Sequence, residues 1–431
     1  MTSAATGPLA GIRVLELSQI VAGPFAGVAL SDLGADVVKV EPPRGEDRRN
    51  SGAVVPNEGK YFQSLNRGKR SLTIDLSKAG GQALVQRIIP GFDVILLNYR
   101  AGVAERLNIG YARLSALNPG LIYANITGFG DSGPYAQRAG SDIVAQAYSG
   151  VMAAEAKVDE HGAPQQLVSS TYLDRTTGLA AAMGICAALF HRAQTGRGQE
   201  IHVSLLQSAL ELLSDKVMRE PVHDSILRDP LMEEIHATQD SGAPYDQVAA
   251  VRKAQAPRFA SHRLFYGGYH TRQGALVLGA LTMQNRDTIR GILAIDDPTD
   301  SPGFNAADPE NRRLIEEWRE RIQERLLERP SHDWVALFLE AGVPASVVNH
   351  PEDMADDPQV VASGMMTAME HEVTGPQRVV SPLVRMAVTP TAARMPAPPL
   401  ARHTREVLLE CGLSEDEVDG LVADGVVTST E

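Results

Sequence analysis

The chain has 431 residues, a hydrophobic content of 43%, a charged content of 22% and a formal net charge of −13. This length is too great for one ordinary core, so two or three domains are expected, and the composition is that of a globular protein. The acidic balance argues against general binding to nucleic acid or to an anionic membrane surface.

Residue usage excludes several further classes. Cys186 and Cys411 lie far apart without CxxC spacing, so we expect neither a disulfide framework nor a structural zinc site. The histidines show no HxxxH or HxH spacing, so we expect no metal. The N-terminus carries no pattern of a secretion signal, and the most apolar stretch, 179–190, is shorter than the about 20 residues that a bilayer requires. We therefore expect a cytoplasmic protein without a membrane or nucleic-acid partner.

The chain opens with a β-α-β pattern, in which strands at 12–17 and 36–41 flank a helix at 25–33. Further elements follow in alternation, with strands at 72–74, 94–97, 121–126 and 200–205 and helices at 81–89, 112–117 and 143–151. Right-handed crossovers place such helices on both faces of a parallel sheet. The pattern predicts an α/β fold with an open, Rossmann-like parallel sheet.

The composition and the periodicity of the sequence change after about residue 215. Residues 216–260 are polar with weak periodicity, and they precede two strands, at 264–269 and 275–281, and two helices, at 310–327 and 334–339. A Pro- and Ala-rich stretch at 389–399 is typical of an extended linker, and two short helices are expected in 404–427. We divide the chain into 1–215, 216–330 and 331–431, with a smaller α/β domain in the middle part.

Asp174 precedes an alanine-rich apolar stretch that ends in the turn Thr195-Gly-Arg-Gly-Gln199. If a helix begins near Arg175, Asp174 lies at its positive end, which favours the ionised carboxylate and also allows it to cap the first amides. One apolar face is formed by Leu179, Met183, Cys186 and Phe190. Small residues on the other faces allow close packing, so a buried helix is expected. Asp174 is therefore either a covalent nucleophile or a helix cap.

Several basic residues have positions suited to an anionic ligand. Lys69 follows Asn66-Arg-Gly, and Arg44 belongs to an early basic cluster; both also fit an ordinary surface role. Asn98-Tyr-Arg100 and Arg106 follow the strand 94–97, at the edge where parallel sheets bind ligands. The chain has no Walker loop and no GxGxxG, which disfavours a nicotinamide enzyme.

Taken in order, these motifs resemble those of the family III CoA-transferases, also called the CaiB/BaiF family. The matching segments are 8–16, 22–24, 33–41, 66–76, 117–123, 127–134, 174–178, 195–199, 342–344, 357–359 and 403–408. The resemblance implies a large domain made from both chain ends, a smaller central domain and an interlocked homodimer. It also implies acyl-CoA and carboxylic acid substrates, with no permanently bound cofactor.

The resemblance carries site residues onto this chain. The catalytic aspartate falls on Asp174, which would form a mixed anhydride and then an aspartyl-CoA thioester. The CoA contacts fall on Ile20, Val21, Ala22, Lys69, Asn98, Tyr99, Arg100, Arg106 and Arg138. Pro42 stands where some members have an arginine, and Arg44 is the expected substitute. The acceptor pocket is expected at His262, Arg263 and Tyr266. The glycine-run loop of formyl-CoA:oxalate transferases is missing before Phe265, which disfavours oxalate chemistry.

Two other functions remain open at this point. Racemases of the same fold oppose the aspartate with a histidine in a Gly-His-Asp motif, whereas this chain has Gly140-Ser141-Asp142. Serine cannot shuttle a proton near neutral pH, which argues against an α-methylacyl-CoA racemase. A CoA-binding protein without catalysis is the second alternative, and the intact Asp174 motif argues against it.

Overall fold

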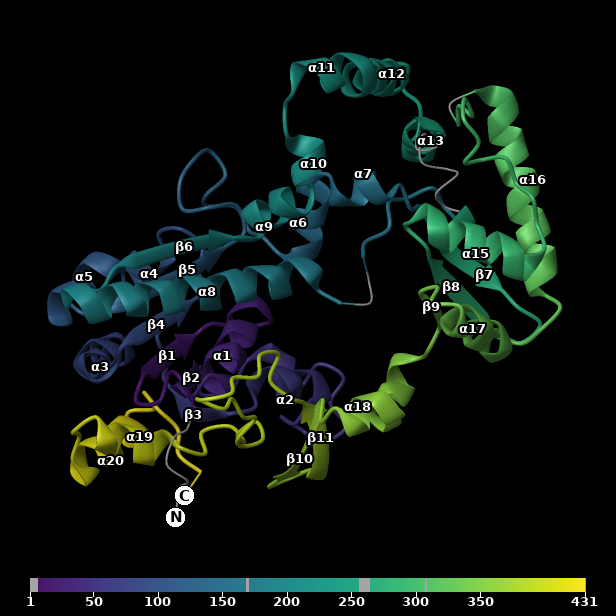
Figure 1. The fold of residues 1–431 in the computed structure, drawn as a ribbon. Coiled ribbons are helices and arrows are strands. Elements are labelled where there is room, and N and C mark those ends of the chain that lie inside the picture. The colour runs from purple at the N-terminus through teal and green to yellow at the C-terminus, as the bar shows by residue number, and fades with distance from the viewer. Residues whose placement is uncertain (1–6, 168–169, 256–263, 307, 431) are drawn as a thin grey trace. The chain divides into compact units, whose positions relative to one another are not determined.

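The computed structural model describes residues 7–167, 170–255, 264–306 and 308–430. The chain forms two compact units, shown in Figure 1. The large unit contains the chain up to Met152, then Gln166–Met218, and the chain from Pro358 onward. The small unit contains Ala153–Gln165 and Arg219–Asp357.

The large unit is built around a six-stranded parallel sheet with the order β3-β2-β1-β4-β5-β6. Its strands are β1 (Arg13–Leu17), β2 (Asp36–Glu41), β3 (Lys69–Thr73), β4 (Val94–Leu97), β5 (Ile122–Thr127) and β6 (Glu200–Ser204). The predicted open parallel sheet is confirmed. β3 begins earlier than expected, because Lys69 already pairs with Val37 of β2. The strand order reverses between β1 and β4, and doubly wound sheets bind ligands at such a switch point.

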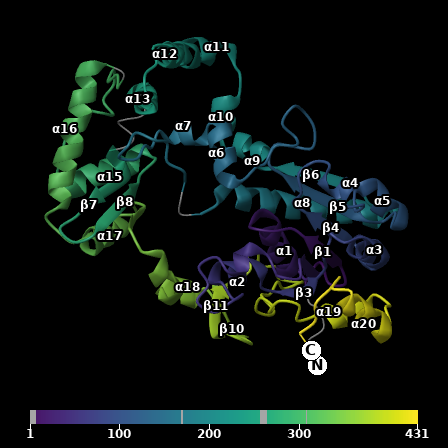
Figure 2. The ribbon, with the colours of Figure 1, turned by 180° about the vertical axis from the view of Figure 1, so that it is seen from behind.

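Helices cover both faces of this sheet, as the views in Figures 1 and 2 show. The helices on one face are α1 (Ala22–Asp32) and α8 (Tyr172–Thr195), and those on the other are α3 (Ala79–Ile88), α5 (Tyr111–Leu117), α19 (Thr404–Glu410) and α20 (Glu415–Ala423). Successive strand residues point to opposite faces, so Val14 enters the α1/α8 core and Leu15 the other. Both cores are therefore built from the same short apolar strands.

The C-terminal part of the chain returns to β3 in the large unit. Met395 accepts a hydrogen bond from the Gly68 amide at 2.8 Å, and the Ala401 amide donates to the Ser71 hydroxyl at 3.0 Å. The remaining short elements along this unit are η1 (Asp47–Arg49), α2 (Lys60–Asn66), η2 (Ile89–Gly91), α4 (Val103–Arg106), α6 (Asp142–Ser149), α9 (Leu205–Leu212), α10 (Ser214–Val217), α18 (Pro358–Ala362), β10 (Met366–His371) and β11 (Gly375–Val380). Helix α7 (Val151–Glu155) begins in this unit and ends in the small one.

The small unit packs helices on a three-stranded antiparallel sheet. Its strands and their helices are β7 (Tyr266–His270), β8 (Ala275–Gly279), β9 (Ala345–Val347), α15 (Met283–Leu293), α16 (Pro309–Leu326) and α17 (Ser331–Glu340). The polar segment 216–255 also forms helices. The periodicity of apolar residues along it is weak because these helices are largely exposed. These are α11 (Pro221–His223), η3 (Asp224–Arg228), α12 (Asp229–Asp240) and α13 (Tyr245–Gln255), and η5 (Pro351–Asp356) follows β9.

Helix α8 differs from its sequence-based description in its buried face. The helix has 24 residues and is long and apolar enough to cross a bilayer by length and composition, although its most apolar stretch, 179–190, is shorter than a bilayer requires. Its inner face combines small residues with Ile185 and Leu189 and packs against α1 and the sheet, as in the core helix of a globular domain. Met183 and Phe190, expected to be buried, are 70% and 68% exposed. A Cβ on Gly178 would lie 2.6 Å from the Ala22 carbonyl oxygen, so the small face is the one that allows close approach.

Candidate active site

Asp174 is the third residue of α8, and another carboxylate caps that helix. Asp142 accepts hydrogen bonds through Oδ2 from the backbone amides of Leu173 at 2.9 Å and Asp174 at 3.0 Å. The carboxylate of Asp174 itself has no hydrogen bond or ion pair with any residue that the structure describes. The capping interpretation of Asp174 is therefore wrong, and its side chain is free for other contacts.

The surroundings of Asp174 favour its protonated form more than the sequence indicated. Burial is the largest cause that raises the pKa of Asp174, to about 7, and the carboxylate of Asp142 raises it further. Arg48 and Arg175 act in the opposite direction. The expected effect of the helix N-terminus is thus outweighed by desolvation and by a like charge. A carboxylate with such a pKa is more basic than an exposed one and still titrates near neutral pH.

Two arginines supply positive charge beside Asp174. Arg48 lies on η1 with its guanidinium 5.1 Å from the ring centre of Tyr61, and Arg175 lies 5.0 Å from that of Phe25. Neither arginine forms a salt bridge within the described parts of the chain, and Nε of Arg175 is buried without a hydrogen-bond partner there. From the sequence, Arg48 is one more cation of the early basic cluster and fits a surface role, because η1 and α8 are far apart along the chain.

The loops that follow β1 and β4 meet at the switch point of the sheet. Asn98 accepts a hydrogen bond from the Gln19 amide at 3.0 Å and donates one to the Gln19 carbonyl at 2.7 Å. Ile20 has a φ of 74° and an exposed side chain, whereas Val21 and Ala22 are buried and offer only backbone groups to a ligand. The structure thus brings together the expected contacts Ile20–Ala22 and Asn98.

Tyr99 and the other expected CoA contacts of the large unit lie in loops and short helices. Burial raises the pKa of Tyr99 to about 12, and its backbone pairs with the Asn125 side chain. The exposed cations of this set are Arg44, Arg100, Arg106 and Arg138. Within the chain as described, none of the four forms a salt bridge, so each remains available to an anion.

The expected acceptor pocket at His262, Arg263 and Tyr266 stays a prediction. Tyr266 is on β7 of the small unit with its side chain exposed. His262 and Arg263 lie outside the described residues.

Lys69 is the expected site residue that the structure removes from the CoA contacts. Its ammonium group is fully buried and lies 2.8 Å from Oε2 of Glu16, with further oxygen partners from Pro24, Leu65 and Asn66 at 2.9–3.0 Å. Burial lowers the pKa of Lys69 to about 8, against the opposing effect of Glu16. An ammonium group enclosed by protein oxygens has no donor left for a phosphate, so this prediction is corrected.

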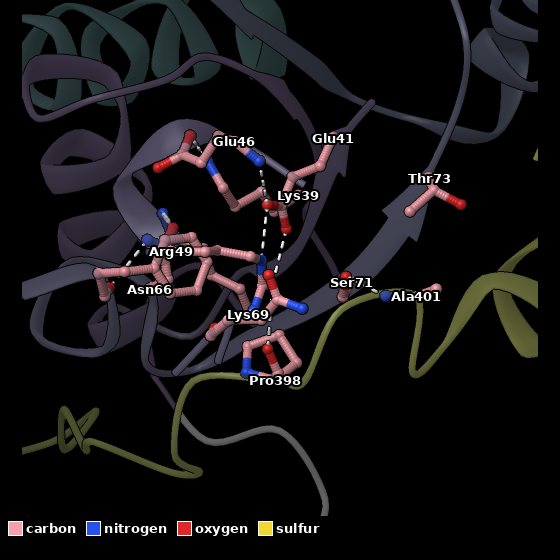
Figure 3. A network of polar contacts seen from close by, with 12 residues as sticks. Lys39, Glu41, Glu46, Arg49, Asn66, Lys69, Ser71, Thr73, Pro398 and Ala401 are labelled. Carbon is pink, nitrogen blue, oxygen red and sulfur yellow. Dashed lines mark hydrogen bonds and ion pairs between the residues drawn. The ribbon is translucent and has the colours of Figure 1, made fainter. Parts of the chain in front are cut away.

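Lys69 belongs to a buried network of charges that Figure 3 shows from close by. Lys39 lies 3.4 Å from Glu16 and 3.1 Å from Glu46. Glu41 accepts two hydrogen bonds from Arg49, at 2.7 and 2.8 Å. Glu46 and Arg49 flank Arg48 in sequence, so the network fixes the segment that carries Arg48 toward Asp174.

Comparisons with known proteins agree with this geometry. The model of CoA-transferase family III matches residues 9–404. The chain is 32% identical to the succinyl-CoA:glutarate CoA-transferase of Homo sapiens over 98% of this chain and 91% of that one. It is also 32% identical to the succinate–glutarate CoA-transferase of Agrobacterium fabrum, over 94% and 95%. A crystal structure of a CaiB/BaiF family protein from Brucella suis superposes with a TM-score of 0.73 at 29% identity, covering 94% of this chain and 100% of that one.

These matches span nearly the whole chain, and they confirm the resemblance drawn from the motifs. The chain therefore belongs to CoA-transferase family III and is an enzyme of that family.

Proposed function

We propose that this protein moves CoA from an acyl-CoA thioester to a carboxylic acid, with Asp174 as the covalent nucleophile. The observation that carries the proposal is the free carboxylate of Asp174, half-buried at the start of α8 and relieved of capping by Asp142. Covalent catalysis requires a nucleophile that is desolvated and not consumed by structural hydrogen bonds. Membership of the CoA-transferase family supports the reaction class.

In the proposed cycle the Asp174 carboxylate attacks the acyl carbonyl carbon, the carbon–sulfur bond breaks, and CoA leaves as a thiolate. A mixed anhydride now joins Asp174 to the acyl group. The thiolate attacks the carbonyl carbon of Asp174 and expels the donor acid as a carboxylate, which leaves an aspartyl-CoA thioester. The acceptor carboxylate attacks this thioester and releases the thiolate. The thiolate then attacks the acceptor carbonyl carbon, which forms the new acyl-CoA and returns Asp174 as a carboxylate.

Each of these steps passes through a tetrahedral oxyanion, and each acid enters or leaves as an anion. Arg48 and Arg175 are suited to stabilise these negative charges, because both act on Asp174 and neither has a salt bridge in the described chain. Two relatives are named for succinyl-CoA or succinate and glutarate, which are dicarboxylic acids. We propose a dicarboxylic acid acceptor, whose second carboxylate would pair with one of these guanidinium groups.

For CoA itself we propose a site at the switch point between β1 and β4. Ile20–Ala22 would offer backbone groups, while the exposed arginines of the large unit would contact the phosphates. Asn98 would act by holding the loop at Gln19, since both polar ends of its amide bind that loop. We place the enzyme in the cytoplasm, because both of its cysteines are free thiols, as is usual in a reducing compartment.

The test combines a substrate screen with chemical trapping. Succinyl-, acetyl- and longer acyl-CoA donors are offered with glutarate, oxalate and monocarboxylic acids, and the new thioester is identified by mass spectrometry. Incubation with donor and hydroxylamine should convert the activated carboxyl of Asp174 to a hydroxamate on its peptide. Asp174→Ala should lose transfer and hydroxamate while it still binds CoA, whereas Asp416→Asn should retain all three. Transfer at the wild-type rate by Asp174→Ala would overturn the assignment.

We also propose that the enzyme is a homodimer that covers the outer face of α8. Leu179, Met183 and Phe190 expose large apolar side chains on that face, and contiguous exposed apolar surface marks protein interfaces. Light scattering should give twice the chain mass of 46.2 kDa for the wild type. Met183→Glu with Phe190→Glu should reduce that mass, whereas Val388→Glu, at an apolar residue exposed outside α8, should not. A monomeric wild type would contradict the proposal.

A further inference from the structure

We propose that Asp142 is a positioning residue for transfer: it holds the first turn of α8 so that the Asp174 carboxylate stays free. This inference rests on the proposed role of Asp174 as the nucleophile. Gly140-Ser141-Asp142 stands where racemases of this fold have Gly-His-Asp, and its aspartate has no role in the proposed cycle.

The first support is the way in which Asp142 is held. It is the first residue of α6, its side chain is 7% exposed, and its Oδ2 takes two amides of α8. Its Oδ1 accepts a hydrogen bond from the Gln146 side chain, whose own Oε1 accepts from the Leu167 amide at 2.9 Å. Gln146 is fully buried. Both oxygens of Asp142 are thus fixed, and they tie the segment before α8 and the start of α8 to α6.

The second support is that α8 does not cap these amides itself. The N-cap residue Thr171 makes no side-chain cap hydrogen bond, and its hydroxyl instead lies 3.4 Å from the hydroxyl of Tyr61. Short polar side chains at a helix start ordinarily fold back onto the free amides. If the Asp174 carboxylate did so, its oxygens would be occupied and turned away from an incoming acyl group. Asp142 takes those amides from outside and prevents this.

The third support is the charge that Asp142 brings. The charged groups that act on Asp174 are Asp142 from α6, Arg48 from η1 and Arg175 from α8 itself. Of the other elements packed on α8, α1 presents Phe25 toward Arg175, and α9 presents the hydroxyl of Ser208 to Thr177. No salt bridge neutralises Asp142 in the chain described. Its negative charge therefore acts on Asp174, which makes the carboxylate more basic and a stronger nucleophile.

Two substitutions separate positioning from charge. Asp142→Asn keeps an oxygen that accepts hydrogen bonds from the two amides but removes the negative charge. The acidic limb of the pH–rate profile, which is the decline of the rate of adduct formation on Asp174 at low pH, should therefore move down by about one pH unit. Asp142→Ala removes the acceptor as well, and we expect adduct formation to fall by about 100-fold through misplacement of the carboxylate. CoA affinity, measured by calorimetry, should change little in both variants.

The control is Ser414→Ala, which removes the capping box of α20 in the same unit and should change neither the pH limb nor the adduct rate. If Asp142→Ala fails to fold, Asp142→Asn alone decides through its pH limb. The inference is overturned if the pH–rate profile of Asp142→Asn has the same acidic limb as that of the wild type. It is also overturned if a folded Asp142→Ala forms the adduct at the wild-type rate. If the wild type forms no adduct, the proposed function fails. Infrared titration of the carboxyl group, assigned by its loss in Asp174→Asn, then still tests whether Asp142 raises its pKa.

Discussion

Replacing Asp174 with asparagine is expected to stabilise the folded protein above pH 7 while it abolishes transfer. The pKa of this carboxyl rises from an ordinary value of 3.8 to about 7, chiefly through burial. Between these values the folded protein binds a proton that the unfolded chain has released. The free energy of unfolding therefore falls as the pH rises from about 4 to about 7, and the loss remains constant above pH 7. Asparagine has the same shape and avoids this cost.

The size of the effect follows from the difference between the two pKa values. A difference of about three corresponds to at most about 4 kcal/mol. Asp174 is only half-buried, and a negative charge in the first turn of a helix is favourable by about 0.5 kcal/mol, so solvent screening and the helix dipole reduce the expected gain to roughly 2 kcal/mol. For cooperative unfolding of a chain of 431 residues, that gain corresponds to an increase of roughly 2 °C in the apparent Tm at pH 8.

The measurement is the Tm of the wild type and of Asp174→Asn by calorimetry at pH 5, 7 and 8. The increase in Tm of the variant over the wild type should be smaller at pH 5 than at pH 8. The matched control is Asp416→Asn, since Asp416 also lies in the first turn of a helix but is exposed. This control should lose a little stability at every pH tested, through loss of the favourable charge. An Asp174→Asn protein that is no more stable than the wild type at pH 8 would refute the claim that a desolvated charge is held at this position.

Three further outcomes are expected. The rate of adduct formation on Asp174 should fall about tenfold per pH unit below pH 7, because only the ionised carboxylate attacks; a flat rate between pH 5 and 8 in rapid-quench experiments would contradict this. Lys39→Met should cost about 3–5 kcal/mol in urea unfolding, because Glu46 then keeps a buried and uncompensated charge; unchanged stability would show that Glu46 is neutral in the folded protein. Gly178→Ala should cost about 1–3 kcal/mol, since its Cβ would lie 2.6 Å from a backbone oxygen of α1. Gly420→Ala, with open space at the Cβ position in α20, should instead gain about 0.5–1 kcal/mol, and equal signs for the two glycines would count against the packing argument.

The sequence by itself was sufficient for the parallel sheet and for the placement of Asp174 near the start of a helix. These features depend on residues that are close together in the chain, so local preferences decide them. They are the alternation along β1 and β2, the glycine and proline breaks and the order of the motifs. It also placed Asn98 at the edge where parallel strands present their carboxyl ends, whereas Ile20 was expected there only from the family resemblance; the structure joins their two loops through Gln19.

Only the tertiary structure decided which charges are buried and which side chains act on Asp174. Lys69 has the sequence context of a phosphate ligand, yet the fold encloses it beside Glu16, and Asp142 caps a helix that begins far along the chain. The pattern of α8 indicated that Met183 and Phe190 are buried, whereas both are exposed and the buried face combines small residues with Ile185 and Leu189. Desolvation and pairing depend on the atoms that packing brings together from distant segments, and no local pattern contains that information.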